Sequence, residues 1–355
     1  MEPGIMNVRL RLIDGEVNRV MESINYQRSL FWEIFLWYCT LFPMIFLINL
    51  KRMKIREQSM KNNPHYISPD HFLWQGRIDD PGNRDAYRWH QVIELLDLTK
   101  EINPHPGPGC CFLGYCCDEG VKRNQGRTGA AFGPDAIRKQ MASLPCYFSD
   151  SFHIYDGGNV VCPGTTLYPS HRVLREALTE VYSLNLIPLL IGGGHDLVLP
   201  HFDALLHDME KREVASPRIG IINFDAHFDL RPYHDTGGNS GTGFYQIANL
   251  CKEKNIPFSY LCVGIQQYGN TKSLFKKAES LGASYIMARD LDMDTLPGNQ
   301  LTVDRFIQEN DYIYVTICAD VLSAAYAPGV SAPQPFGLHP EVVITLLKHI
   351  LATGK

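Results

Sequence analysis

Two carboxylates and an imidazole stand two residues apart in the segment Asp-Ala-His-Phe-Asp at residues 225–229. They follow an apolar run, residues 219–224, that predicts a buried β-strand. Because side chains alternate along an extended chain, Asp225, His227 and Asp229 are expected on one side of it. Such a set at a strand end is typical of a site for a divalent metal. The alternative is a polar loop whose charges are simply solvated.

A second apolar run, residues 187–191, leads into three glycines and then the pair His195-Asp196. Glycine lets the backbone turn sharply and approach another group closely. His195 would then lie at the carboxyl end of a strand, where open α/β sheets bind their ligands. Otherwise the stretch is a glycine-rich turn in which Asp196 caps a helix.

A third apolar run, residues 312–318, is followed by the acid Asp320. After it comes Ala-Pro-Gly-Val-Ser-Ala-Pro at residues 327–333, which predicts a rigid loop. Three predicted strands that each end in potential ligands strengthen the prediction of a metal site.

Together these motifs resemble the arginase (ureohydrolase) superfamily, and within it the formimidoylglutamases of histidine degradation. The residues that carry the resemblance are Gly-Gly-Gly-His-Asp at 192–196, Asp-Ala-His-Phe-Asp-Leu-Arg at 225–231 and the loop at 327–333. The resemblance covers roughly residue 65 to the C-terminus. It implies hydrolysis of N-formimidoyl-L-glutamate to L-glutamate and formamide, by attack of a metal-bound hydroxide on the amidine carbon.

The resemblance also implies two Mn²⁺ ions. His195, Asp225 and Asp229 would bind one ion. His227, Asp225 and Asp320 would bind the other, so that Asp225 is shared. Asp229 would also be a catalytic residue, because its carboxylate can accept a hydrogen bond from the attacking hydroxide.

One ligand position departs from the family. Its strand motif Asp-x-Asp corresponds to Cys318-Ala319-Asp320, so Cys318 stands where a bridging carboxylate is expected. Mn²⁺ prefers oxygen ligands, whereas a thiolate favours Zn²⁺. The site would work with a substituted ligand, hold one ion or bind weakly, unless Cys318 is only a core residue. The alternative function is therefore a catalytically weak or inactive arginase-fold protein, or another ureohydrolase that acts on a guanidino compound.

Several polar residues are candidates for substrate binding. Arg231 follows the Asp-x-His-x-Asp motif closely, and a guanidinium binds a carboxylate in a fork. The other interpretation of Arg231 is a surface salt bridge. Ser240 and Thr242 lie in a glycine-rich loop and could form hydrogen bonds with the substrate. By the resemblance, Asn124 or Arg127 helps to shape the substrate pocket from the loop at residues 118–129.

The composition is that of an ordinary globular protein of 355 residues, with 45% hydrophobic and 20% charged residues. The net charge of −5 argues against a positively charged surface that binds nucleic acid. The expected partners are a small-molecule substrate and possible further copies of the same chain. None of the ten cysteines forms a Cys-x-x-Cys pair, which favours core cysteines in a reducing compartment over a disulfide framework.

Apolar runs alternate with helical patterns along the chain, which predicts a three-layer α/β/α arginase-like fold with a mostly parallel sheet. No linker divides it. Compared with the family, the chain is expected to lack the C-terminal strand, its acidic motif and a closing helix. Strands are expected at residues 110–115, 187–191, 218–224, 259–264, 284–287 and 312–318, and helices at residues 88–99, 133–138, 170–184, 195–211, 271–280 and 342–352.

Residues 1–60 form an atypical N-terminal extension ahead of the metallohydrolase domain at 65–355. Its segment 29–50 is strongly apolar, and the charge-free part, 34–50, reaches the lower limit of roughly 17 residues for a membrane-spanning helix. Two interpretations compete. Either the segment is an anchor whose following basic residues leave the catalytic domain in the cytoplasm, or translation starts at Met53 or Met60 and the protein is cytoplasmic.

Overall fold

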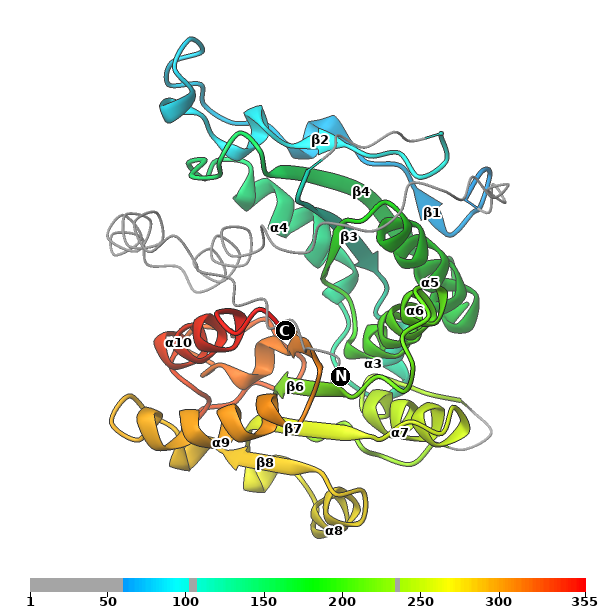
Figure 1. The fold of residues 1–355 in the computed structure, drawn as a ribbon, viewed down its shortest axis with the longest axis vertical. Helices are drawn as coiled ribbons and strands as arrows, with labels where there is room; N and C mark the ends of the chain where they lie inside the picture. The colour runs from blue at the N-terminus through cyan, green and yellow to red at the C-terminus, as the bar shows by residue number, and fades with distance from the viewer. Residues whose placement is uncertain (1–59, 102–106, 234–236) are drawn as a thin grey trace, which may run out of the picture.

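The computed structural model describes residues 60–101, 107–233 and 237–355 (Figure 1). The N-terminal extension and its apolar segment 29–50 lie outside these ranges. The strands are β1 (Tyr66–Ile67), β2 (Glu94–Leu95), β3 (Gly109–Cys116), β4 (His153–Val161), β5 (Ile187–Ile191), β6 (Ile219–Phe224), β7 (Ser259–Ile265), β8 (Ser284–Met287) and β9 (Tyr312–Ile317). The helices are α3 (Glu119–Arg123), α4 (Gly133–Met141), α5 (Leu167–Ser183), α6 (Val198–Lys211), α7 (Gly243–Glu253), α8 (Lys272–Ser280), α9 (Leu296–Gln308) and α10 (Pro340–Leu351).

Two sheets, rather than one, run through the molecule. The first has the order β1-β4-β3-β5, with β2 also paired to β4, and the second has the order β8-β7-β6-β9. Every strand pair is parallel except β1 with β4. The mostly parallel architecture is therefore confirmed, and its division between β5 and β9 is a feature that the sequence did not predict.

No helix within the described ranges is long and apolar enough to cross a membrane.

Each sheet is covered on both faces. In β3, Cys111 and Leu113 pack with apolar residues of α5, whereas Cys110 and Phe112 pack with Met141 at the end of α4. This alternation is what a strand with two buried faces requires.

The second sheet repeats the arrangement. In β6, Ile219 and Ile221 face the cluster that contains Phe202 of α6, whereas Ile222 and Phe224 face the cluster formed with α9 and α10. The expected three-layer α/β/α architecture is thus confirmed (Figure 1).

Residues 88–99 were expected to form a helix, and this prediction is wrong. The chain makes one 3₁₀ turn, η3 (Trp89–Gln91), and then the short strand β2. The Trp89 side chain is fully buried, and its backbone amide donates to the Leu144 carbonyl at 2.9 Å. Tertiary contacts therefore override the helical pattern here.

A buried ion pair holds α4 against β4. The Arg138 guanidinium is fully buried and donates to both carboxylate oxygens of Asp156, at 2.9 and 2.7 Å. It also donates to Asn159 Oδ1 at 2.6 Å, and the Trp74 indole N–H donates to Asp156 at 2.7 Å. With every polar partner satisfied, the pair fixes the packing of the helix on the first sheet.

Replacing Asp156 by Asn is expected to lower the free energy of unfolding by about 3–5 kcal/mol, because it leaves the Arg138 charge buried and uncompensated. Asp135→Asn is the matched control. Asp135 is half-exposed and lies 3.9 Å from the same guanidinium, so its loss should cost less than about 1 kcal/mol. Urea unfolding of both variants checks the difference, and equal midpoints would contradict it.

Candidate metal centre

Two glycines turn the chain from β5 toward the site. Gly192 and Gly193 have φ angles of +75° and +79°, a backbone region that favours glycine. A Cβ atom on Gly193 would lie 2.4 Å from the Tyr115 carbonyl oxygen, so only glycine fits this close approach. The turn predicted from the triple glycine is present, and it delivers His195 to the first position of the 3₁₀ turn η5 (His195–Leu197).

The segment after β6 carries the Asp-x-His-x-Asp motif. Asp225 is completely buried, whereas His227 and Asp229 are only partly buried. Asp229 has a positive φ angle of 47°, an unusual conformation for a residue with a side chain. Such strain costs on the order of 1–3 kcal/mol and is concentrated at functional sites.

Asp225 lies between the two imidazoles. His195 Nδ1 is 3.0 Å from Asp225 Oδ2 and 2.9 Å from Asp229 Oδ2. His227 Nδ1 is 3.1 Å from Asp320 Oδ2 and 3.5 Å from Asp225 Oδ1. Five of the six side chains that were predicted as ligands are therefore brought together, with Asp225 in the shared position.

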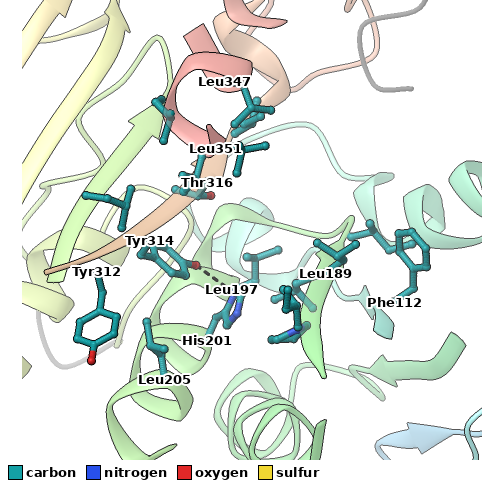
Figure 2. A pocket seen from close by; sticks show the side chains of 18 of the residues that line it. Phe112, Leu189, Leu197, His201, Leu205, Tyr312, Tyr314, Thr316, Leu347 and Leu351 are labelled. Atoms are coloured by element: carbon teal, nitrogen blue, oxygen red, sulfur yellow. Dashed lines mark hydrogen bonds between the residues drawn. The ribbon is translucent and has the colours of Figure 1, made fainter. Parts of the chain in front are cut away.

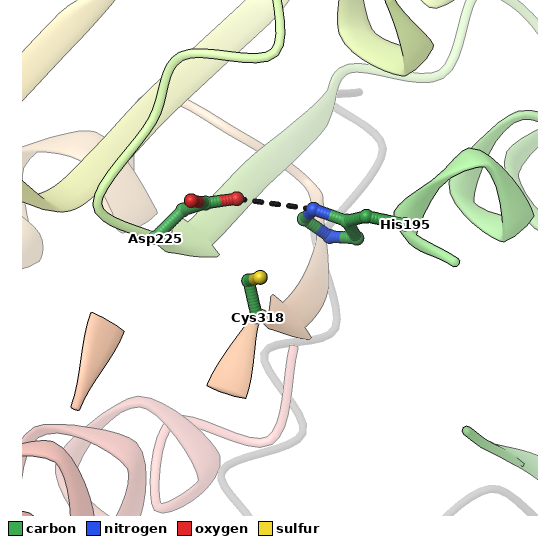
Figure 3. Close-up of side chains that lie close together, drawn as sticks. All are labelled: His195, Asp225 and Cys318. Carbon is green, nitrogen blue, oxygen red and sulfur yellow. Dashed lines mark ion pairs between the residues drawn. The ribbon is translucent and has the colours of Figure 1, made fainter. Parts of the chain in front are cut away.

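Cys318 belongs to the same cluster. It precedes the 3₁₀ turn η8 (Ala319–Val321), which places Asp320. Ligand atoms of His195, Asp225 and Cys318 lie within 4.8 Å of one another, as do those of Asp225, His227 and Asp320. Figure 3 shows the first group converging on one point, with the thiol below the ion pair. Its thiol therefore lies within reach of a cation held by His195 and Asp225.

Burial and mutual charge set the protonation of these groups. Burial alone would lower the pKa of His195, but its hydrogen bonds to Asp225 and Asp229 raise that pKa to about 10. Burial would likewise lower the pKa of His227, but its hydrogen bonds to Asp225 and Asp320 raise that pKa to about 11. Burial, and then the charge of Asp225, raises the pKa of Asp320 to about 6. The neighbouring carboxylates therefore favour the protonated form of both imidazoles.

The donor set fits a divalent cation. Burial and repulsion from Asp225 raise the pKa of Asp229 and Asp320, so positive charge among them would relieve the repulsion. Oxygen and nitrogen ligands suit Mn²⁺. Burial and the neighbouring carboxylates hold the pKa of the Cys318 thiol well above its usual range, so Cys318 is a neutral and weak ligand until a metal displaces its proton.

Metal binding is expected to release about two protons per chain near neutral pH, because imidazole coordinates a metal only when neutral. The raised pKa values of His195 and His227 mean that both must lose a proton on binding. Mn²⁺ affinity should therefore rise with pH between about 7 and 9. Calorimetric titration in buffers with different ionisation enthalpies measures the protons released, and a value of zero would show that the imidazoles are already neutral.

Three candidate substrate-binding residues come from two loops that touch. Asn124 Nδ2 donates to Ser240 Oγ at 3.1 Å, and the Arg231 amide donates to the Gly241 carbonyl at 3.0 Å. A Cβ atom on Gly241 would lie 3.2 Å or less from both Asn124 and Arg231. The stretch 118–129, expected as a loop, contains the short helix α3, and Asn124 is the residue that ends it.

Two other candidates are engaged in fixing loops. The Arg127 guanidinium donates to the carbonyls of Pro328 at 2.9 Å and Val330 at 2.6 Å, and so ties down the loop at 327–333. Thr242 is completely buried, and its hydroxyl contacts Asn239 and Gln246. Arg127 and Thr242 therefore hold the loops at 327–333 and 239–246 in place.

The structure adds residues that sequence reasoning missed. Asn270 accepts from the Phe228 amide at 3.1 Å and donates to the Ala226 carbonyl at 2.8 Å, which fixes the backbone of the Asp-x-His-x-Asp segment. Thr316 Oγ1 lies 3.1 Å from His195 Nε2, on the far side of the ring from the carboxylates. Neither residue stands in a recognisable motif, although Thr316 is two residues before Cys318.

Comparison with known proteins agrees with this geometry. The family model described as the arginase family matches residues 109–355. A formimidoylglutamase from Clostridium tetani is 46% identical over 288 residues, which are 80% of this chain and 84% of the relative. A formimidoylglutamase from Legionella pneumophila strain Paris is 43% identical over 80% of this chain and 85% of its own.

Solved structures share the fold. The formimidoylglutamase of Bacillus subtilis superimposes with a TM-score of 0.61 at 20% identity, over 76% of this chain and 92% of that chain. The formiminoglutamase of Trypanosoma cruzi, solved with Mn²⁺, gives a TM-score of 0.57 at 21% identity, over 69% of this chain and 93% of that chain.

Proposed function

The chain belongs to the arginase family, and on that premise we propose that it hydrolyses N-formimidoyl-L-glutamate to L-glutamate and formamide. The observation that carries the proposal is the sharing of Asp225 between two imidazole–carboxylate groups at the ends of three strands. The identity of 46% to a formimidoylglutamase supports the choice of substrate.

Two Mn²⁺ ions are part of the proposal. His195, Asp225 and Asp229 would bind one ion, and His227, Asp225 and Asp320 the other, with Cys318 beside the first. When bound, such a pair lowers the pKa of water and supplies a nucleophile at neutral pH. Asp229 would orient the attacking water through its carboxylate, and the positive φ angle holds that carboxylate beside His195.

Arg231 is the proposed anchor for a carboxylate of the substrate. Its side chain is exposed, and none of the ion pairs found among the described residues involves it. A free guanidinium beside the site can take a carboxylate in a fork. Asn124 and Ser240, which already form a hydrogen bond with each other, would line the same side of the pocket.

Replacing Arg231 by Met is expected to raise KM for formimidoylglutamate by about 10–100-fold with a smaller change in kcat, because a charge-assisted hydrogen bond contributes about 1.5–3 kcal/mol to binding. Arg218→Met is the control. Arg218 is an exposed arginine paired with Asp311 just before β6, at the opposite end of the strand from the site. Equal KM values for both variants would remove Arg231 from the substrate site.

Side-by-side assays test the substrate itself. Purified Mn²⁺-loaded protein should release formamide and glutamate from formimidoylglutamate, and little urea from guanidino compounds. Protein that binds Mn²⁺ and cleaves only another amidine would keep the reaction class and exclude this substrate.

We also propose a reducing, cytoplasmic location, since the nine cysteines that the structure describes are all free.

A further inference from the structure

The two groups of potential ligands differ in their donor atoms. The first group consists of His195, Asp225 and Cys318, so it combines a nitrogen, an oxygen and a sulfur. The second group consists of Asp225, His227 and Asp320, which supply nitrogen and oxygen. One carboxylate oxygen of Asp225 faces His195 and the other faces His227, so the shared residue serves both positions without removing this difference. The two positions can therefore select different cations.

The backbone directs the sulfur to the first position. The Cys318 amide donates to the Phe224 carbonyl at 2.8 Å, which fixes the end of β9 beside the end of β6. Cys318 is the residue before the turn η8, and its side chain belongs to the first group. Asp320, two residues later in the same turn, belongs to the second group. Figure 3 shows the Cys318 sulfur close to the ion pair of His195 and Asp225.

The imidazole of the first position is already oriented. His195 Nε2 lies 3.1 Å from Thr316 Oγ1. An outer hydrogen bond of this kind fixes the ring of a histidine that binds a metal. His195 Nδ1 is left to face the carboxylates of Asp225 and Asp229, at 3.0 and 2.9 Å. With Asp229 included, the first position offers one nitrogen, two carboxylate groups and one sulfur.

Four donors of these kinds suit zinc better than manganese. Zn²⁺ binds histidine nitrogen, cysteine sulfur and carboxylate oxygen, and it is commonly four-coordinate in proteins. Mn²⁺ favours octahedral sites made of oxygen ligands, and thiolate ligands select softer cations such as zinc. The donor set of the first position is therefore that of a zinc site, whereas the second position lacks a sulfur ligand among the described residues and suits Mn²⁺.

A cation can reach the sulfur from the cavity between β5 and β9. Cys318 and Thr316 both line this cavity, which has a volume of about 1930 Å³. Figure 2 shows Thr316 among the side chains around it. Cys318 is only half-buried, so its thiol proton can pass to solvent when a metal binds.

We propose that the first position binds Zn²⁺ with the Cys318 sulfur as one of its ligands, and that the second position binds Mn²⁺. His195, Asp225 and Asp229 would be the other ligands of the zinc ion. On binding, the S–H bond of Cys318 breaks, the sulfur bonds to zinc, and the proton goes to solvent. The inference refines the pair of ions in the proposed function and rests on the same ligands, but it does not depend on the substrate.

The first test compares the metal preference with and without the sulfur, because zinc binds most protein sites more tightly than manganese does. The full chain is stripped of metal, kept reduced by a phosphine and equilibrated with buffered Zn²⁺ and Mn²⁺. Elemental analysis is expected to find one ion of each metal per chain. Cys318→Ser is expected to lower the preference for Zn²⁺ over Mn²⁺ by about 100-fold or more. An unchanged preference would overturn the proposal.

X-ray absorption at the zinc edge gives a readout that is independent of activity. Zinc in the natural protein is expected to have one sulfur neighbour at about 2.3 Å, which Cys318→Ser should lose. Cys262→Ser is the matched control, and it should keep this neighbour. Cys262 Sγ lies 3.4 Å from the His227 carbonyl oxygen but outside both ligand groups. Zinc with only nitrogen and oxygen neighbours in the natural protein would overturn the proposal, whether or not the variants fold.

The outcomes also separate this inference from the proposed function. Two Mn²⁺ ions per chain in the presence of zinc, together with release of formamide, would overturn the zinc assignment and leave the proposed function in place. One zinc with a sulfur neighbour and one manganese, without hydrolysis of formimidoylglutamate, would support the zinc assignment and contradict the proposed substrate.

Discussion

Asp225→Asn is expected to abolish Mn²⁺ binding and to lower kcat by about 1000-fold or more, which corresponds to roughly 4 kcal/mol of transition-state stabilisation. Asp225 is the one side chain shared by both groups of potential ligands, so the substitution weakens both at once. The amide has nearly the same shape as the carboxylate, and it cannot supply the negative charge that two cations would share. Elemental analysis and steady-state kinetics measure the two effects.

Asp304→Asn is the matched control for this prediction. Asp304 also pairs with a histidine, His349, at 2.6 Å, but the pair joins α9 to α10 at the surface. The control should keep its metal and its activity. Two ions per chain in Asp225→Asn, with a normal thermal transition, would show that the shared carboxylate does not bind metal.

Cys318→Asp is expected to tighten Mn²⁺ binding by about tenfold or more and to raise activity accordingly. In the natural chain, burial and the charge of Asp225 keep the Cys318 thiol protonated, and sulfur is a poor ligand for Mn²⁺. A carboxylate at the same position would add an oxygen ligand within reach of His195 and Asp225. Metal content per chain after purification in Mn²⁺ measures the effect.

Cys318→Ser separates the carboxylate from the loss of the thiol, because it removes sulfur without adding charge. Little metal in the natural protein and in Cys318→Ser, with recovery in Cys318→Asp, would favour the catalytically weak arginase-fold protein. Two Mn²⁺ ions in all three would show that Cys318 is tolerated and would contradict the prediction.

The strands that carry ligands could be predicted from sequence because each is a largely apolar run followed by a motif. Strand β4 could not be predicted in this way. Asp156, Gly157, Gly158 and Asn159 interrupt its pattern, and three of them accept the buried hydrogen bonds of Arg138, which comes from the preceding helix α4. Local periodicity carries no signal of such a partner.

The same distinction applies at the site. The glycine turn before His195 and the convergence of Asp225 with both histidines follow from motif and strand direction. Asn270 could not be found, because it reaches the site only through hydrogen bonds to backbone atoms more than forty residues earlier in the chain. Helices α7 and α9 were also missed, since a glycine or proline and several polar residues dilute their apolar stripe.

The division of the sheet has a consequence for unfolding. Each sheet has its own pair of apolar clusters, and α6 packs in one cluster of each sheet, so the two halves can act as cooperative units that are linked through this helix. His195 comes from the first half, and Asp225 and Asp229 from the second, so their ion pairs also join the two units. A cation held by the same residues would bind only when both halves are folded. Metal binding and the cooperative unfolding of the two halves would therefore be thermodynamically linked.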